Sequence, residues 1–354
     1  MMASKTISFA TYNLFNLNLP NKKMYGRDGW DSKEYQRKVE WSADSLKFID
    51  SDVWGFQELW HRDALEDIFA KARLKSSYEL LIPRGTVGAG IICAGAVRKD
   101  MLVGEPEWVI DFPNDLVLKA KGDDEQTCDI EINVSSFSRP VLRFSIKPKA
   151  NGKPIVIYVA HLKSKLPTRV TKEDWYKKSI HGNHQSAVGA ALATVRRTAE
   201  ATALRWLLTE DMKKTDASVV VLGDLNDGQH SNTLNILSEQ PGYLFGDSKG
   251  GADNGLYTVG TLQEYRSLRD VYYTHIFKNK RESLDHILVS EQFYDNSRKR
   301  LWKFKDMGIY NDHLNDGNHK ETGTSDHGIV KATFSYSKAK QIKKKNVKMK
   351  VGRT

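Results

Sequence analysis

The chain has 354 residues, 40% of them hydrophobic, and a formal net charge of +10, which fits either two average domains or one large α/β unit with a buried core. Its two cysteines, Cys93 and Cys128, allow at most one disulfide, which excludes a disulfide-stapled secreted scaffold and makes reduced thiols the default. No signal peptide is visible and no segment approaches about 18 consecutive apolar residues, so we expect an intracellular, cytoplasmic protein without a transmembrane segment.

Short β-branched runs alternate with amphipathic segments, a pattern that is typical of α/β folds with the helices outside. Three helices are predicted, at residues 32–50, about 62–74 and about 186–213. The first follows an Asp-Ser cap and has one apolar face, formed by Val39, Ser42, Ala43, Leu46 and Ile49. Strands are predicted at residues 6–14, 53–57, 78–83, 88–97, 137–147, 154–163, 218–224, 284–290 and 327–335. Because turns separate several strands, the pattern favours a mixed two-sheet sandwich over a purely parallel sheet.

Polar residues close the first two predicted strands. Asn13 follows the first apolar run and Glu58 ends the run DVWGFQE. A carboxylate at a strand end suits magnesium, which binds few carboxylates and keeps several waters. A dedicated zinc site is disfavoured, because His161 and His327 lack cysteine partners and lie on separate predicted strands.

The strand at residues 154–163 ends in a histidine. Under the period of two, His161 shares one face with Ile155, Ile157 and Val159, so it ends a core-facing row. A core histidine bonded to the backbone is the plain alternative.

The run VVVLGDLND is too continuously apolar for an exposed strand. Gly223 is expected to turn the backbone so that Asp224 and Asn226 emerge side by side, where a carboxylate and an amide can orient a water. An ordinary Asx turn after the strand is the alternative.

Asp285 in the triplet LDH and His327 in the triplet SDH form a further pair. A carboxylate bonded to an imidazole fixes its tautomer and raises its basicity, which favours the imidazolium form.

Together, SDH at residues 325–327, GDLND, LDH, Asn13, Glu58 and His161 resemble the endonuclease/exonuclease/phosphatase family of DNase I-like, metal-dependent phosphodiesterases, over residues 7–334. The resemblance implies a two-sheet α/β sandwich with mixed sheets and helices outside. It also implies hydrolysis of a phosphodiester by a metal-assisted water, with Mg²⁺ or Mn²⁺ as cofactor. We expect one such domain at residues 1–337 and a basic, disordered tail at residues 338–354.

The resemblance also implies roles for the individual residues. Glu58 is a metal ligand, and Asn13 and Asp326 complete the metal's surroundings. Asp224 aligns or deprotonates the attacking water, and Asn226 orients that water or the phosphate. His161 and His327, the latter held by Asp285, contact the phosphate and stabilise the charge of the transition state. Whether Asp224 or His327 takes the proton of the water stays open.

Arg139, in the sequence SRP, matches a family position and is expected to clamp a phosphate or the acids of the site, with a structural ion pair as the alternative. Residues 163–184 mix cations with aromatic rings and suit a nucleic-acid strand, or else form a solvated loop. Residues 21–37, with Tyr25, Trp30 and Tyr35, have a similar composition. The substrate-binding candidates are Arg139, Lys163, Lys165, Trp175, Tyr176 and Lys177.

The charge is concentrated at the C-terminus, where residues 338–354 hold eight Lys and Arg and no acid, which leaves residues 1–337 at +2. Such a tail attracts polyanions without specificity or simply keeps the chain soluble. The function that we expect is a nuclease, either an endonuclease or an exonuclease, acting on nucleic acid. A phosphoinositide or other phosphoester phosphatase is the runner-up, and an inactive nucleic-acid-binding module is the alternative of another class. The oligomeric state stays open.

Overall fold

Two six-stranded sheets form the centre of the computed structural model, which describes residues 6–122, 126–148, 153–213, 215–238, 255–267 and 273–339. The first sheet contains β1 (Thr6–Leu17), β2 (Val53–His61), β3 (Tyr78–Leu81), β4 (Val87–Arg98), β15 (Trp302–Tyr310) and β16 (Ile329–Tyr336). The second contains β5 (Leu102–Asp111), β8 (Ser136–Ile146), β9 (Ile155–His161), β10 (Ser218–Asp224), β11 (Tyr257–Thr258) and β14 (Asp285–Val289). Two short ribbons, β6 (Lys119–Ala120) with β7 (Ile130–Glu131) and β12 (His275–Phe277) with β13 (Lys280–Glu282), lie outside these sheets.

Both sheets are mixed. Their strand orders are β15-β16-β1-β2-β4-β3 and β11-β14-β10-β9-β8-β5. In the first sheet β1 runs parallel to β2, and in the second β9 runs parallel to β10, while the neighbouring pairs on either side are antiparallel. The predicted mixed two-sheet sandwich is therefore confirmed.

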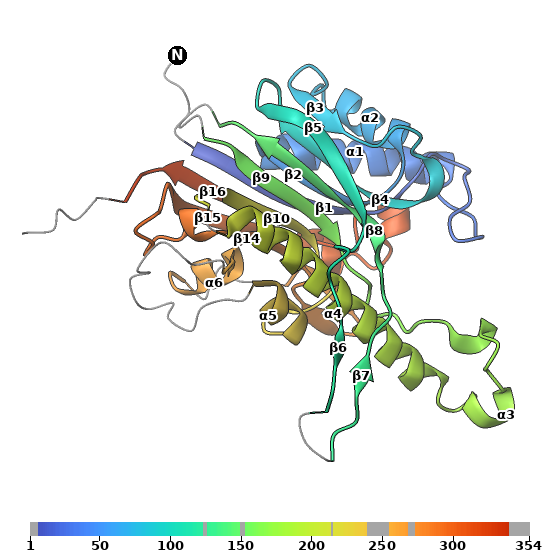
Figure 1. The fold of residues 1–354 in the computed structure, drawn as a ribbon. Coiled ribbons are helices and arrows are strands. Elements are labelled where there is room, and N and C mark those ends of the chain that lie inside the picture. The colour runs from blue at the N-terminus through green and yellow to red at the C-terminus, as the bar shows by residue number, and fades with distance from the viewer. Residues whose placement is uncertain are drawn as a thin grey trace, which may run out of the picture.

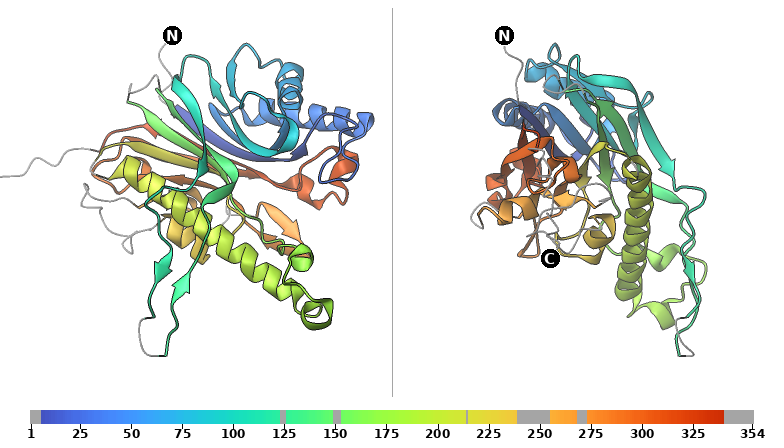
Figure 2. Two further views of the ribbon diagram at one scale, coloured as in Figure 1. Left: turned by 45° about the vertical axis from the view of Figure 1, so that its right-hand side comes forward. Right: turned by 60° about the vertical axis from the view of Figure 1, so that its left-hand side comes forward.

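Helices cover the outer faces of the two sheets (Figures 1 and 2). α1 (Ser32–Ile49) and α2 (Arg62–Lys71) pack on the first sheet, and α4 (Gln185–Met212) packs on the second. The shorter helices are α3 (Lys178–His181), α5 (Asn232–Ser238), α6 (Val259–Glu264) and α7 (His319–Thr322), with 3₁₀ turns at Val170–Lys172, Glu291–Phe293 and Asp312–Asn315. None of the helices within the described ranges combines the length and the hydropathy needed to traverse a bilayer.

The start of α1 shows why this segment is helical. Asp31 accepts hydrogen bonds from the backbone of Lys33 and Glu34, and the Glu34 carboxylate accepts from the Asp31 backbone, which is a complete capping box. The five residues predicted as the apolar face of this helix are all buried. They pack on the outer face of the first sheet.

The inter-sheet core is built by strand alternation. Ile155, Ile157 and Val159 of β9 point into it, as do Val220 and Leu222 of β10. The intervening residues of both strands face α4 instead. In each of the two strands, the last residue therefore lies on the same face as the side chains that fill the space between the sheets.

All nine predicted strands and all three predicted helices are present, with ends that differ by a few residues. Two longer strands, β5 and β15, were not predicted. Each lies at the edge of its sheet, where one side has no strand partner among the described residues and where Pro106 and several charged residues are tolerated. Their sequences therefore lack the continuous apolar character of central strands. From residue 340 onward the predicted basic tail lies outside the described residues.

Gly55 of β2 lies where the two sheets approach each other closely. A Cβ atom at this position would lie 2.9 Å from Cβ of Leu222 and 3.1 Å from the Cγ atoms of Val159, both in the other sheet. Replacing Gly55 with Ala should lower the free energy of unfolding by about 1–3 kcal/mol through overpacking, as measured by urea denaturation. Gly90→Ala in β4 is the control, because a Cβ atom there meets nothing within 4 Å. Equal stability of the two variants would contradict this account.

Candidate active site

Three polar side chains lie in one row across the second sheet. His161 of β9 is in register with Asp224 of β10, and Asp224 is in register with Asp285 of β14. All three continue the rows of apolar side chains that fill the space between the sheets. They are at most 4% exposed, so the end of the inter-sheet core is polar rather than apolar.

The first sheet contributes Asn13 from β1. The Asn13 amide donates a hydrogen bond of 3.0 Å to Oδ2 of Asp224, and its Oδ1 accepts one from the backbone of Phe15. The side-chain amide is therefore held in one orientation. This contact joins the two sheets directly over the carboxylate of Asp224.

Glu58 reaches the same region through an irregularity in β2. The pairing of β2 with β4 shifts register between Phe56 and Leu59, and Glu58 has a left-handed backbone conformation with φ 62°. Such a conformation is uncommon for a residue with a side chain and concentrates at functional sites. The bulge brings the Glu58 carboxylate to the backbone of Asn16, which donates to it at 2.9 Å, and to within 4.0 Å of Nε2 of His161.

The triplet at residues 325–327 completes the cluster from the loop before β16. The Ser325 hydroxyl donates to the backbone carbonyl of Asn13 at 2.8 Å and accepts from the backbone of His327. Nδ1 of His327 lies 2.8 Å from Oδ2 of Asp285, and Nε2 lies 3.8 Å from Oδ2 of Asp224. The predicted pairing of Asp285 with His327 is present in the structure.

Asn226 turns the chain after β10. It has φ 54°, its backbone donates to Oδ1 of Asp224 at 3.0 Å, and its side chain donates to the carbonyl of Leu162. The prediction that the chain turns at Gly223 is wrong, because Gly223 lies within β10. A Cβ atom there would lie 2.1 Å from the carbonyl oxygen of Ala160, so this glycine allows close strand packing and Asn226 makes the turn.

The two histidines differ in charge. Burial, together with repulsion from Arg139 and His327, holds the pKa of His161 well below its usual range, so its imidazole is neutral. Burial alone would lower the pKa of His327, but the carboxylates of Asp285 and Asp224 raise it well above the usual range, so His327 is an imidazolium. Burial raises the pKa of Asp224 to about 7, with Asp285 and Glu58 adding to the increase.

The donor set fits a divalent cation. Burial and the nearby charge of Asp326 raise the pKa of Glu58, so the two carboxylates repel each other unless a cation lies between or beside them. Oδ1 of Asp285 and Oδ1 of Asp326 are buried without a hydrogen-bond partner. Two groups of side chains bring possible ligand atoms within 4.8 Å of one another, namely Asp224, Asp285 and His327, and His275, Asp326 and His327.

Three predicted substrate-binding residues lie beside this cluster. The guanidinium of Arg139 donates to the carbonyl of Leu162, the same carbonyl that accepts from Asn226. Lys163 donates through Nζ to the carbonyls of Ser164 and Leu166. Lys165 forms ion pairs with Glu282 at 3.0 Å and with Asp227 at 3.4 Å.

Trp175, Tyr176 and Lys177 lie farther away. Tyr176 donates to Gln185 at the start of α4, and the Trp175 ring packs edge-on against His181. Arg197, on the same helix, contacts Asp227 next to the site. At a rise of 1.5 Å per residue, Gln185 and Arg197 are separated by about 18 Å along α4. The loop at residues 163–184 therefore begins at the site and extends beyond the two sheets (Figure 1).

The second aromatic segment, at residues 21–37, is only partly available to a ligand. Trp30 is 2% exposed and its indole donates to the carbonyl of Asn16, so it is a core residue rather than a stacking surface. Tyr35 donates to Asp67. Tyr25 is the most exposed aromatic ring of this segment, at 65%, whereas Tyr35 is partly buried.

Lys38, which no sequence pattern singled out, is fully buried beside the site. Its ammonium group donates to the carbonyl of Thr324 at 3.1 Å and to the hydroxyl of Tyr12 at 3.4 Å. Four aromatic rings surround it at 5.5–5.9 Å, those of Tyr12, Phe15, Trp30 and Trp41. Lys38 thus ties α1 to the loop that carries Asp326. Nothing in the sequence distinguishes it from the other lysines of this helix.

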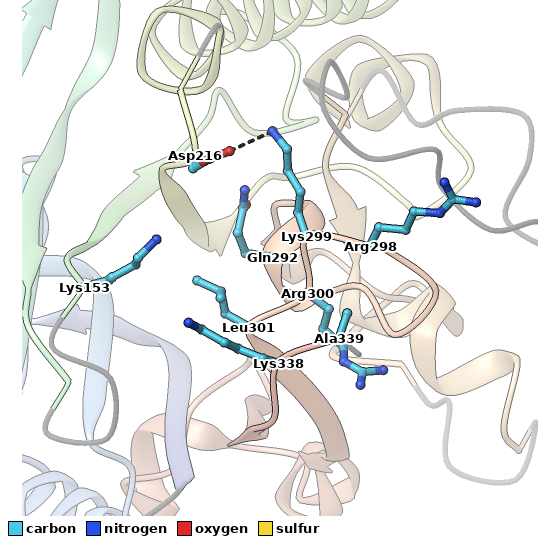
Figure 3. Close-up of a pocket in the computed structure, with 9 residues that line it drawn as sticks. All are labelled: Lys153, Asp216, Gln292, Arg298, Lys299, Arg300, Leu301, Lys338 and Ala339. Atoms are coloured by element: carbon cyan, nitrogen blue, oxygen red, sulfur yellow. Dashed lines mark ion pairs between the residues drawn. The ribbon is translucent and has the colours of Figure 1, made fainter. Parts of the chain in front are cut away.

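A pocket of about 190 Å³ lies at the other ends of the same strands (Figure 3). Two of its lining residues, Lys153 and Asp216, precede β9 and β10, whereas His161 and Asp224 end these strands. Its lining is rich in cations, one of which, Lys299, forms an ion pair with Asp216. With strands of this length, the pocket is about 20 Å from the polar cluster and is no part of it.

The sequence model of the Endonuclease/Exonuclease/phosphatase family matches residues 133–327, more than half of the chain, and the chain therefore belongs to this family. Members of the family hydrolyse phosphoester bonds. No curated protein matches the whole sequence closely enough to count as a relative.

Solved structures share the fold at low sequence identity. D. rerio TDP2 complexed with a single-strand DNA product matches with a TM-score of 0.54 and 16% identity over 93% of this chain and 99% of that one. The human Nocturnin catalytic domain with bound sulfate matches with a TM-score of 0.54 and 15% identity, over 94% of this chain and 96% of that one. Bacteroides thetaiotaomicron mannosyl-6-phosphatase Bt3783 matches with a TM-score of 0.53 and 17% identity, over 93% of this chain and 100% of that one. At these identities the matches establish the DNase I-like fold alone.

The buried lysine gives a testable pH dependence. Burial lowers the pKa of Lys38 to about 7, whereas an unfolded lysine titrates near about 10.4. Between these values the unfolded chain binds more protons, so stability should rise with pH through this group. In metal-free protein, Lys38→Met should remove that part of the rise in unfolding free energy between pH 7 and about 10. Lys33→Met, on the exposed face of α1, is the control, and an unchanged pH profile for Lys38→Met would refute the assignment.

Proposed function

We propose that this protein is a metal-dependent phosphodiesterase, most specifically a nuclease, that hydrolyses a phosphodiester of a nucleic acid with water. The observation that carries the proposal is the buried Asp224 carboxylate, which is held by Asn13 and flanked by a neutral and a cationic imidazole. All eight residues singled out in the sequence for metal binding or catalysis lie in or beside this one cluster, namely Asn13, Glu58, His161, Asp224, Asn226, Asp285, Asp326 and His327.

Each side chain has a role in this proposal. Glu58 and Asp326, with Asn13 beside them, would hold Mg²⁺ or Mn²⁺, which supplies positive charge to a phosphoryl oxygen. Asp224 orients the attacking water and accepts its proton, because its pKa near 7 lets it exchange a proton at neutral pH. Asn13 and the backbone of Asn226 fix the direction of that carboxylate.

The imidazoles act on the phosphate. His327 is cationic and held by Asp285, so it offers an N–H and a positive charge to the oxygens that gain charge in the transition state. His161 is neutral and lies 3.5 Å from Asp224. Arg139 and the side chain of Asn226, which share the Leu162 carbonyl, are placed to orient the substrate phosphate.

The shape of the molecule supports a polymer as substrate. The loop at residues 163–184 carries the exposed ring of Trp175 and the exposed cations Lys172, Lys177 and Lys178. It reaches Gln185 at the start of α4, about 18 Å along this helix from Arg197 beside the site. A small phosphate ester cannot bridge that distance, whereas several nucleotides can. Lys165, by contrast, is engaged with Glu282 and Asp227, so its role in phosphate binding requires these ion pairs to open.

Removal of the central groups should strongly slow turnover. Asp224→Asn and His327→Ala should each lower the rate of Mg²⁺-dependent cleavage by about 10²–10⁴-fold, while the free energy of unfolding changes far less. Asp216→Asn, at the other end of β10, is the control and should retain the wild-type rate. The measurement uses labelled DNA, RNA, abasic DNA and inositol phosphates with Mg²⁺, Mn²⁺ or a chelator.

The substrate panel decides between classes of activity. Cleavage of inositol phosphates alone would replace the nuclease proposal with the phosphatase runner-up. Binding of nucleic acid without cleavage of any substrate would favour the inactive binding module.

The loop makes a separate prediction about affinity. Replacing Lys172, Lys177 and Lys178 together with Ala should weaken nucleic-acid binding and reduce the slope of log affinity against log salt by about 2–3, since each phosphate contact contributes roughly 0.7–0.9. Fluorescence anisotropy with a labelled oligonucleotide measures this slope. The control replaces Lys99, Lys303 and Lys305, which are exposed at the other ends of the strands. If both triple variants show the same slope, the loop does not bind the substrate.

A further inference from the structure

His275 lies beside the active site, where backbone contacts of its own and of the preceding residue fix its position. It begins the short strand β12, and its backbone forms a bridge with His327. The preceding residue, Thr274, is fully buried; its hydroxyl accepts from the backbone of Asp285 at 3.2 Å, and its carbonyl accepts from Gly328 at 2.7 Å. These contacts lock His275 to the two segments that carry the pair Asp285 and His327.

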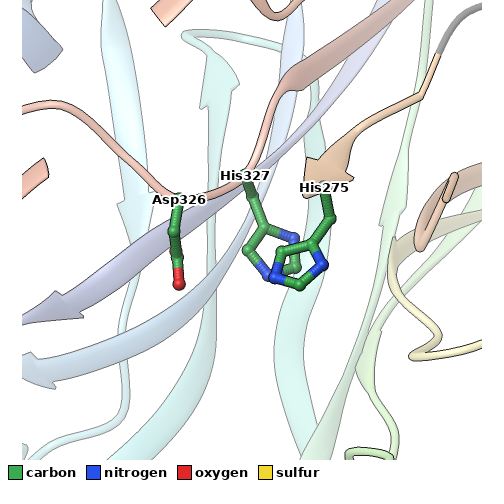
Figure 4. A group of neighbouring side chains, drawn as sticks. All are labelled: His275, Asp326 and His327. Carbon is green, nitrogen blue, oxygen red and sulfur yellow. The ribbon is translucent and has the colours of Figure 1, made fainter. Parts of the chain in front are cut away.

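The three side chains of His275, Asp326 and His327 project in the same direction (Figure 4). The ring centroids of His275 and His327 are 4.7 Å apart. One nitrogen of each ring and one carboxylate oxygen of Asp326 all lie within 4.8 Å of one another. Oδ1 of Asp326 is buried without a hydrogen-bond partner. Ligands of a tetrahedral ion at about 2.1 Å lie roughly 3.4 Å apart, so small side-chain rotations close the site.

The surroundings suit metal ligands. Nδ1 of His327 faces Asp285, which leaves Nε2 for a cation, and a carboxylate on the far nitrogen is the usual support of a metal-bound histidine. Two imidazoles and one carboxylate favour a borderline transition ion over Mg²⁺, which prefers oxygen ligands.

We propose that His275, Asp326 and His327 form a second cation site that takes a borderline divalent transition ion, with Zn²⁺ as the best fit, and that its occupation inhibits the enzyme. An ion at this site replaces the Nε2 proton of the His327 imidazolium, which is released to solvent, and so removes the N–H that His327 otherwise offers to the phosphate. It also shares Asp326 with the position assigned to Mg²⁺. Binding of Zn²⁺ is independent of the reaction catalysed, whereas the inhibition rests on the proposed function.

The first experiment measures binding alone. Zn²⁺ is titrated into the full-length, metal-free protein in competition with a fluorescent zinc chelator. His275→Phe keeps a ring against His327 but removes both nitrogens, and it should weaken the tightest site by at least about 10-fold. His230→Phe, at an exposed position, is the control and should leave this site unchanged. Unaltered affinity in His275→Phe overturns the proposal; if this variant fails to fold, His275→Gln serves in its place.

The second experiment measures inhibition at saturating Mg²⁺. The Zn²⁺ concentration that halves the rate of phosphodiester hydrolysis should rise at least about 10-fold in His275→Phe relative to wild type and to His230→Phe. Equal inhibition of all three proteins would overturn the inhibitory role. If the wild type hydrolyses no substrate, the proposed function fails, while the chelator competition still decides whether the zinc site exists.

Discussion

The hydrogen bond from Asn13 to Asp224 is the contact on which the rest of this site depends. It joins the two sheets over a carboxylate that is 1% exposed and that would be strongly destabilising without partners. The backbone of Asn226 satisfies the other carboxylate oxygen, and His161 and His327 approach from either side. The residue at the centre of the proposed chemistry is therefore also the residue that ties the sandwich together at this end.

The polar cluster extends outward from that contact through the backbone. Register across β9, β10 and β14 places His161, Asp224 and Asp285 in one row, and the Ser325 hydroxyl ties the next segment to the carbonyl of Asn13. Carboxylates outnumber the cationic imidazole at the centre, which leaves buried oxygens without donors. This surplus of negative charge is the physical reason that the site fits a cation.

Around this rigid centre, the parts that face a ligand differ in how firmly they are held. Arg139 and Lys163 are anchored by backbone carbonyls, and a buried carboxylate of α4, Glu200, accepts from the backbone of Lys163 and of Ser138. Trp175 and its neighbours at the start of α4 contact mainly one another. A rigid centre with an extended rim suits one chemical step on a long substrate, with the rim determining which polymer is bound.

The sequence by itself determined the strands and helices with strong periodicity, the mixed sandwich, and the residues at the strand ends, because alternation and a polar residue after an apolar run are local signals. Edge strands β5 and β15 gave weaker signals, since their outer sides face solvent. Only the tertiary structure placed Glu58 on its bulge, surrounded Lys38 with aromatic rings, buried Trp30 and set His275 against His327. Each of these positions results from contacts between segments far apart in the chain, and such contacts leave no periodic pattern in any one of the segments.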